Sequence, residues 1–235
     1  MSDAALSPDE TRFAWVWAVT PSKLTTEIAI FDIATGVTTE LPATRSSNET
    51  GRCWETTSCT GQVRFPRWSP DATRLVFYRW LMSPELARLY YSSAAYLVAP
   101  DGSGFARVTP VESAAYQPVW SPDGTLLAFD TLEWRRTSDG TGVGHSGVAV
   151  IAADGQGLRQ LADLADGASW ALDGYIIFRS QNGSRVVSPI GGEASDVESG
   201  LAGLTAAGCS ICPRPVFDDA TGAVGLAFWQ PNQHR

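Results

Sequence analysis

A five-residue phrase that begins with tryptophan recurs along this chain. It reads Trp68-Ser69-Pro70-Asp71-Ala72, then Trp120-Ser121-Pro122-Asp123-Gly124 and, less closely, Trp170-Ala171-Leu172-Asp173-Gly174. The copies start 52 and 50 residues apart, and each runs into an apolar stretch. A period of this length is close to that of one four-stranded blade of a β-propeller, which has roughly 40–50 residues.

Two weaker copies flank the three clear ones. Leu6-Ser7-Pro8-Asp9 precedes an apolar stretch near the start of the chain, and Pro215-Val216-Phe217-Asp218 precedes another near its end. Repeats therefore start near residues 6, 68, 120, 170 and 217. Because the period runs through nearly all 235 residues, we expect residues 1–235 to form a single β-propeller domain.

The third repeat shows how one blade is built. The expected strands are Tyr116–Trp120, Leu126–Phe129, Gly147–Ala152 and Leu158–Leu161. Between the first two lies a Ser-Pro-Asp-Gly turn, in which proline presets φ and glycine adopts a positive φ. Short strands separated by turn residues, without a helical period of any length, predict an all-β fold.

A Trp-Ser-Pro-Asp-Gly turn followed by an Asp-Gly turn resembles the repeat of the TolB-like β-propeller family, which is a WD-repeat-like propeller. The resemblance covers residues 6–230 with gaps at the insertions; the second half of the fourth repeat, Arg185–Glu193, is eroded. It implies a β-propeller of four to five four-stranded blades. Such scaffolds carry many unrelated functions.

How the ring closes is open at this point. Four repeats have both halves, and the fifth has two strands before Arg235. We expect five repeats with a shared or incomplete last blade. In one alternative, residues 214–229 complete the first blade, because residues 3–6 make a poor inner strand. In another, the chain is a piece of a longer propeller.

Charge and hydropathy argue against nucleic-acid binding, a membrane-spanning helix and a signal peptide. Seventeen basic residues against 25 acidic ones give a net charge of −8. Without a basic stripe, we expect no binding to nucleic acid. No apolar run approaches the roughly 18 residues of a membrane-spanning helix, and residues 1–5 lack the features of a signal peptide.

Four cysteines occur as two local pairs, Cys53 with Cys59 and Cys209 with Cys212. One interpretation is two disulfides in an exported protein, and another is a four-thiolate zinc site. The five residues between Cys53 and Cys59 are looser than zinc-ribbon spacing, which favours disulfides. A reduced set in a cytosolic protein and other connectivities stay open.

Strand order divides the loops between two faces. If the strands of a blade alternate in direction, the tight turns all share one face, which we call the tight-turn face. The long insertions share the other, the long-loop face: residues 44–62, 81–95, 132–146 and 200–213. Long loops on a rigid scaffold commonly carry binding groups.

The long-loop face is rich in aromatic and arginine side chains, which dominate protein-interface hot spots. The candidate binding residues are Arg52, Trp54, Glu55, Trp80, Tyr90, Tyr91, Trp134, Arg135, Arg136 and His145. These side chains could also stack on sugars, or merely pin their own loops to the scaffold. We expect a protein partner, with a glycan as the alternative.

Catalytic patterns are weak or incomplete. Residues 144–148 nearly spell a nucleophile elbow but end in Val148 rather than glycine, and no helix follows. The repeated Asp71, Asp123 and Asp173 fit turn formation better than a metal site, and Trp68, Trp120 and Trp170 fit packing between blades. No cofactor, metal or catalytic residue is predicted.

The sequence therefore predicts a non-catalytic TolB-like propeller that binds a partner protein through its long-loop face. The resemblance and the cysteine pairs imply a periplasmic or extracellular location. The alternatives are a carbohydrate-binding or sensing domain, and the propeller part of a larger serine peptidase-like enzyme.

Overall fold

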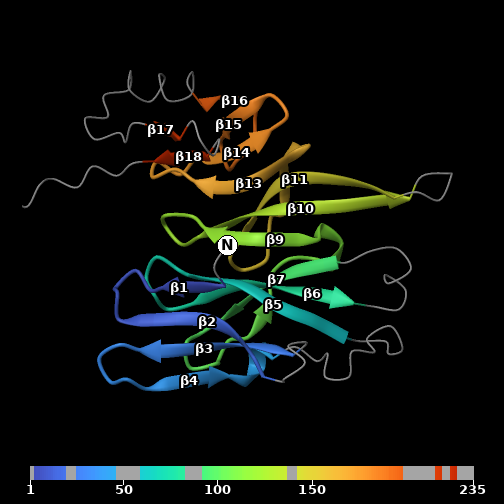
Figure 1. Cartoon of the computed structure of the whole chain (residues 1–235). Coiled ribbons are helices and arrows are strands. Elements are labelled where there is room, and N and C mark those ends of the chain that lie inside the picture. Colours follow the sequence, from blue (N-terminus) through green and yellow to red (C-terminus); the bar gives the residue numbers. More distant parts are fainter. Residues whose placement is uncertain are drawn as a thin grey trace, which may run out of the picture.

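The computed structural model describes residues 3–19, 25–45, 59–82, 92–136, 142–197, 215–218 and 223–226. It is almost entirely β, with four four-stranded antiparallel sheets and one two-stranded sheet. In each four-stranded sheet the strands follow one another in chain order (Figure 1). This confirms the predicted all-β, propeller-like fold of four-stranded blades, and within the described residues the fifth repeat contributes two paired strands.

The four blades have the following strands. Blade one contains β1 (Ala4–Leu6), β2 (Arg12–Ala18), β3 (Thr26–Asp32) and β4 (Thr38–Leu41). Blade two contains β5 (Cys59–Trp68), β6 (Leu75–Met82), β7 (Ser92–Val98) and β8 (Ala106–Arg107). Blade three contains β9 (Ala115–Trp120), β10 (Leu126–Arg136), β11 (Gly142–Ala152) and β12 (Arg159–Asp163). Blade four contains β13 (Ala165–Trp170), β14 (Ile176–Ser180), β15 (Gly183–Val187) and β16 (Ser195–Asp196).

The remaining elements are short. Strands β17 (Pro215–Asp218) and β18 (Ala223–Leu226) pair with each other in the two-stranded sheet. Within the part of the chain that the structure describes, the 3₁₀ turns η1 (Pro42–Thr44) and η3 (Val111–Ser113) follow blade one and blade two. Because β1 pairs with β2 as the first strand of blade one, the alternative in which residues 214–229 complete that blade is wrong. The eroded second half of the fourth repeat still forms two strands.

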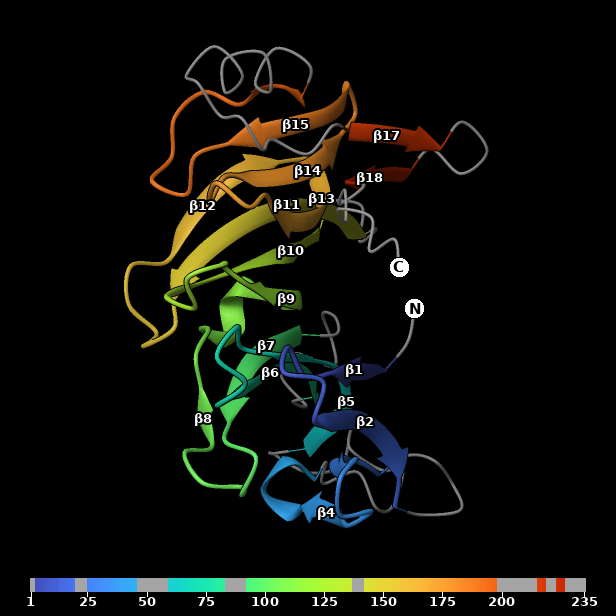
Figure 2. The same cartoon turned by 90° about the vertical axis from the view of Figure 1, so that its left-hand side faces the viewer.

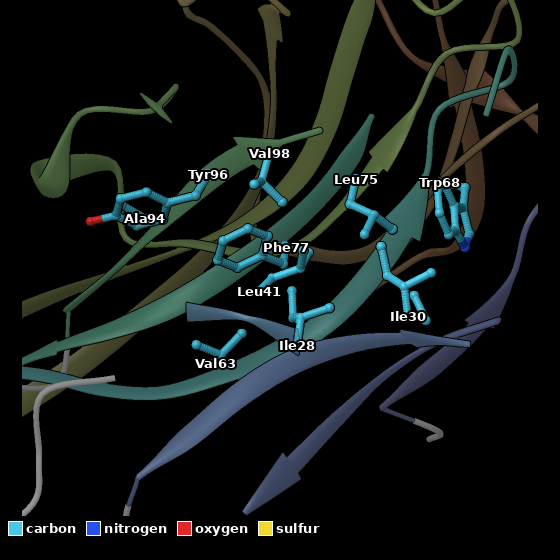
Figure 3. Close-up of a cluster of buried hydrophobic side chains, with 11 residues drawn as sticks. Ile28, Ile30, Leu41, Val63, Trp68, Leu75, Phe77, Ala94, Tyr96 and Val98 are labelled. Atoms are coloured by element: carbon cyan, nitrogen blue, oxygen red, sulfur yellow. The ribbon is translucent and has the colours of Figure 1, made fainter. Parts of the chain in front are cut away.

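The four sheets stand in a row in chain order, with blade one at one end and blade four at the other (Figures 1 and 2). The middle strands of a blade are buried on both faces, which explains their continuous apolar runs. Leu75 and Phe77 of β6 face blade one, and Val76 between them faces blade three. Figure 3 shows the first of these clusters, in which Ile28 and Leu41 meet Phe77.

Tryptophan joins each blade to the one before it in the same way at all three junctions. The indole Nε1–H of Trp68 donates to the carbonyl oxygen of Ala5 at 3.2 Å. That of Trp120 donates to Arg67 at 3.2 Å, and that of Trp170 to Val119 at 3.1 Å. The acceptor always belongs to the first strand of the preceding blade. The ring thus fills the gap between two sheets while its polar atom is satisfied.

A left-handed residue precedes each of these tryptophans by three positions. The φ angles are +61° at Phe65, +48° at Gln117 and +71° at Gly167. At each of them the strand register shifts against the neighbouring strand, as it does at a β-bulge. Because a bulge turns the strand locally, it re-aims the tryptophan toward the preceding blade.

The tight turns are held by a serine and an aspartate. Ser69 Oγ donates to Asp71 Oδ1 at 2.6 Å, and Ser121 Oγ donates to Asp123 Oδ1 at the same distance. The backbone N–H of Thr125 donates to that Asp123 oxygen at 3.0 Å. These bonds to the charged form, the serine's above all, hold the pKa of Asp71 and Asp123 below the usual value.

We predict that the Trp120 junction is a large contributor to stability. Trp120→Ala is expected to lower the free energy of unfolding by about 3–5 kcal/mol, because it empties a buried ring site. Trp120→Phe keeps most of the packing but loses the bond to the Arg67 carbonyl, so a smaller loss is expected. Urea unfolding measures both; equal losses would contradict a role for the indole N–H.

Acid is predicted to loosen the tight turns. Since the folded-state pKa of Asp123 lies below its unfolded value near 3.8, the carboxylate's contribution is present above that value and is lost as pH falls through the folded pKa. Asp123→Asn should therefore lower the melting temperature at pH 7 and flatten its fall between pH 5 and pH 2. Glu40→Gln controls for the lost charge; an equally flattened profile there would refute the assignment.

Candidate functional site

The sheet topology places the long-loop face. Since consecutive strands are antiparallel in every blade, the second-to-third connections and the connections between blades lie at one end of the sheets. The tight Ser-Pro-Asp turns lie at the other. In blade four the second-to-third connection has shrunk to a turn between Ser180 and Gly183, which pair directly. Blade four therefore contributes no long second-to-third loop to this face.

A two-stranded arm extends from blade three on this face. Strands β10 and β11 stay paired in unbroken register from Leu126↔Ala152 to Arg136↔Gly142. Figure 1 shows the pair reaching beyond the other sheets. The expectation of a long loop at residues 132–146 was wrong. Most of that segment is strand, because the pairing of β10 with β11 continues beyond the blade.

The arm carries four of the predicted binding residues. Trp134 lies opposite Gly144 and Arg135 opposite Val143, while Arg136 lies opposite Gly142. His145 lies opposite Glu133. A hairpin holds these positions in fixed order and at fixed spacing, which a loose loop would not do.

Trp80 belongs to an aromatic cluster between blades two and three. Its ring lies edge-on to Tyr116 of β9, with centroids 5.2 Å apart, and edge-on to Tyr78 at 6.2 Å. Tyr78 and Tyr116 are themselves 5.6 Å apart. All three rings are half-buried, so Trp80 joins two blades as well as bordering the long-loop face.

Burial governs the acid–base properties of this cluster. It raises the pKa of Tyr78 to about 12, and it raises that of Tyr116 as well. Both phenols are therefore neutral hydrogen-bonding groups at physiological pH. The charge of Arg64 acts in the opposite direction on Tyr78, but burial outweighs it.

Sequence reasoning missed a polar cluster between blades one and two. Glu27 of β3 is fully buried, and the Nε of Arg45 donates to its Oε2 at 2.5 Å. Arg79 of β6 is 6% exposed and donates through Nη2 to the carbonyl oxygen of Thr44 at 2.6 Å. Its guanidinium also lies 5.1 Å from the ring centre of Tyr96. The one signal in the sequence was an arginine inside an apolar strand.

This cluster fixes the end of blade one where the chain leaves for the next loop. Burial lowers the pKa of Arg79; the ring faces and carbonyl oxygens around it nevertheless favour a cation. Thr44 completes the arrangement, because its Oγ1 accepts from the N–H of Ile28 and donates to Leu41. We interpret the cluster as a rigid base for the face rather than as a reactive centre.

The remaining predicted binding residues, Arg52, Trp54, Glu55, Tyr90 and Tyr91, lie outside the described residues. Cys53, Cys209 and Cys212 lie outside them too, and Cys59 is placed at the start of β5 opposite Met82 without its side chain being described. The disulfide and zinc interpretations of the cysteines both stay predictions.

The near-match to a catalytic motif does not have the geometry that the motif needs. Residues 144–148, which nearly match a nucleophile elbow, lie inside β11 of an antiparallel sheet. An elbow instead needs a sharp strand-to-helix turn. Asp71, Asp123 and Asp173 sit in separate turns. Among the described residues, no group of three potential metal ligands meets, and no helix has the length and hydropathy to cross a membrane.

Comparison with known proteins gives a likeness in fold. No protein-family model and no curated protein matches the chain. Among solved structures, TolB from Acinetobacter baumannii has a TM-score of 0.51 at 16% identity, covering 81% of this chain and 41% of its own. Acylaminoacyl peptidase from Pyrococcus horikoshii scores 0.55 at 14% identity, covering 83% and 32%. Oligogalacturonate lyase from Vibrio parahaemolyticus scores 0.53 at 13% identity, covering 94% and 56%.

These similarities are structural and partial. Identities below 25% carry information about fold and not about chemistry. The chain spans less than two thirds of each of the three proteins, and less than half of the TolB structure. The predicted likeness to TolB-like propellers is thus supported at the level of the fold, and the same fold occurs in a peptidase and a lyase.

Proposed function

We propose that this chain is a non-catalytic binding module that holds a partner protein on the long-loop face. The observation that carries the proposal is the β10–β11 arm. Trp134, Arg135 and Arg136 are positions on its paired strands, which continue from the core of blade three. Tryptophan and arginine on a rigid support are the residue types that dominate protein-interface energetics.

The rest of the face fits the same role. The Trp80 cluster joins blades two and three at this end of the sheets, and the bond from Arg79 to the Thr44 carbonyl oxygen joins blade two to blade one. These contacts hold the described ends of the blades in place before a partner binds, which limits the conformational freedom that those parts lose on binding. The net charge of −8 favours a partner with a neutral or basic contact surface over an acidic one.

The location and domain organisation are part of the proposal. The likeness to TolB structures and the two cysteine pairs support a periplasmic or extracellular protein. The repeat supports one propeller domain over residues 1–235.

A second candidate function comes from the likeness to acylaminoacyl peptidase. In that case this chain would be the propeller part of a larger enzyme, and catalysis would belong to segments beyond these residues. An antibody against this chain distinguishes the two proposals by the size of the native product in the source cell. If that product is much larger than 25.1 kDa, the chain is part of a larger enzyme. A product of matching size favours the stand-alone module.

The partner can be found and the face tested together. A photo-reactive benzoylphenylalanine placed at position 134 in the source cell is expected to cross-link to a partner protein. The same group at Ile33, which is exposed on the tight-turn face, is not. A glycan-rich adduct at position 134 would favour the carbohydrate alternative. Absence of any adduct specific to position 134 would contradict the proposal.

Substitutions then measure the contribution of the arm. With the partner that the cross-link identifies, Trp134→Ala and Arg135→Ala are each expected to weaken binding by about tenfold or more, as interface hot spots do. Their melting temperatures should stay within about 2 °C of the wild type, because both positions lie beyond the part of β10 that pairs with β9 in the blade. Ile33→Ala is the control; equal dissociation constants for all four proteins in calorimetry would exclude the arm.

A further inference from the structure

The three blade junctions differ on the tight-turn face, although their tryptophan bonds are the same. At the first two junctions an arginine lies over the indole ring: Arg12 is 4.7 Å from the ring centre of Trp68, and Arg74 is 5.0 Å from that of Trp120. Each arginine is the fifth residue after the turn serine. At the third junction that position is Leu126.

Leu126 cannot make the contacts that arginine makes at the other two junctions. The Nη2 of Arg12 crosses to the next blade and donates to the carbonyl oxygen of Ala72 at 2.8 Å, while its charge lies against the ring face. Leu126 is partly buried beside Trp170 in the core cluster between blades three and four. It contributes packing, but no cation and no donor that reaches the next blade.

The third junction is also more open. At the second junction, a Cβ added to Gly124 would lie 3.5 Å from Pro70 of the preceding turn. At the equivalent Gly174, nothing lies within 4 Å of such an atom. A hollow of about 430 Å³ occupies this place, lined by Leu126 and Trp170 together with the ring of Tyr175. The missing arginine therefore coincides with a vacant space above an indole ring.

The walls of the hollow are apolar and its rim is acidic. Leu172 is 61% exposed and Tyr175 39% exposed. Pro189 forms the far wall, and Arg159 holds it there by donating to its carbonyl oxygen at 2.6 Å. The carboxylates of Asp123 and Asp173 line the same hollow. A cation with an apolar stem, such as an arginine side chain, matches this combination of an aromatic face, apolar walls and negative charge.

We propose that the hollow over Trp170 is a second binding site, which takes an arginine side chain presented by a partner protein between apolar neighbours. The chain's own Arg12 and Arg74 show how such a side chain lies on the equivalent tryptophans. The incoming guanidinium sits on the Trp170 ring near Asp123 and Asp173, and its flanking apolar residues cover Leu172 and Tyr175. This site is on the opposite face from the β10–β11 arm and is independent of the function proposed for that arm.

The test uses a pentapeptide with blocked ends, glycine-leucine-arginine-leucine-glycine, and a neutral twin in which citrulline replaces arginine. Binding is followed by NMR through the indole N–H signals, with that of Trp170 assigned from Trp170→Phe. The arginine peptide is expected to shift the Trp170 signal and to bind about tenfold more tightly than the citrulline peptide. Equal affinities, or equal shifts at Trp68 and Trp120, would overturn the proposal.

Leu126→Arg restores the missing arginine within the chain and should occupy the site. It is expected to abolish the shift that the arginine peptide causes at Trp170. Ile33→Arg adds the same charge to the tight-turn face but on blade one, and it should leave the affinity for the peptide unchanged. Full binding by Leu126→Arg would refute the site. If that variant loses the Trp170 signal by unfolding, the comparison of the two peptides on the wild-type chain still decides.

Discussion

The bond from a tryptophan indole to a carbonyl of the preceding blade is the interaction on which the rest of this structure depends. It occurs at Trp68, Trp120 and Trp170 with nearly the same length. Because the acceptor lies on a first strand, the bond sets how far one sheet stands from the next. The apolar residues of the middle strands can then pack on both faces. Each junction repeats the same hydrogen bond and packing, so the stability of the fold is a sum of similar contacts between neighbouring blades.

Because of this arrangement, the two faces of the propeller tolerate different changes in sequence. The tight-turn face is held by Ser–Asp bonds close to the tryptophans, so even one replacement there, Leu126 for an arginine, changes the surface that a junction presents. At the long-loop face, segments can lengthen without moving the tryptophan bonds, and the β10–β11 arm is such a case. The same scaffold thus offers small pockets between blades on one side and projecting surfaces on the other.

The sequence predicted the parts that repeat. The Trp-Ser-Pro-Asp phrases placed the turns, and the apolar runs placed the middle strands. Pairing of residues 132–136 with residues 142–146 was not predictable, because a strand that extends beyond its blade has no periodic burial to mark it. The Glu27–Arg45 pair and the buried Arg79 were missed for a related reason: their partners lie in other strands or are backbone carbonyls. Of the binding residues expected on the long-loop face, Trp80 turned out to pack between blades.

The unbroken register of the β10–β11 arm constrains how such an arm changes in related chains. Each added pair of residues, one on either strand, lengthens it by about 3.4 Å. A single added residue would force a bulge or turn every side chain beyond it to the other side. Arms of this kind should therefore differ in length by even numbers of residues, which keeps the pairing intact. Because successive side chains alternate between the two faces, two residues must be added to each strand if the arm is to keep the same side toward a partner.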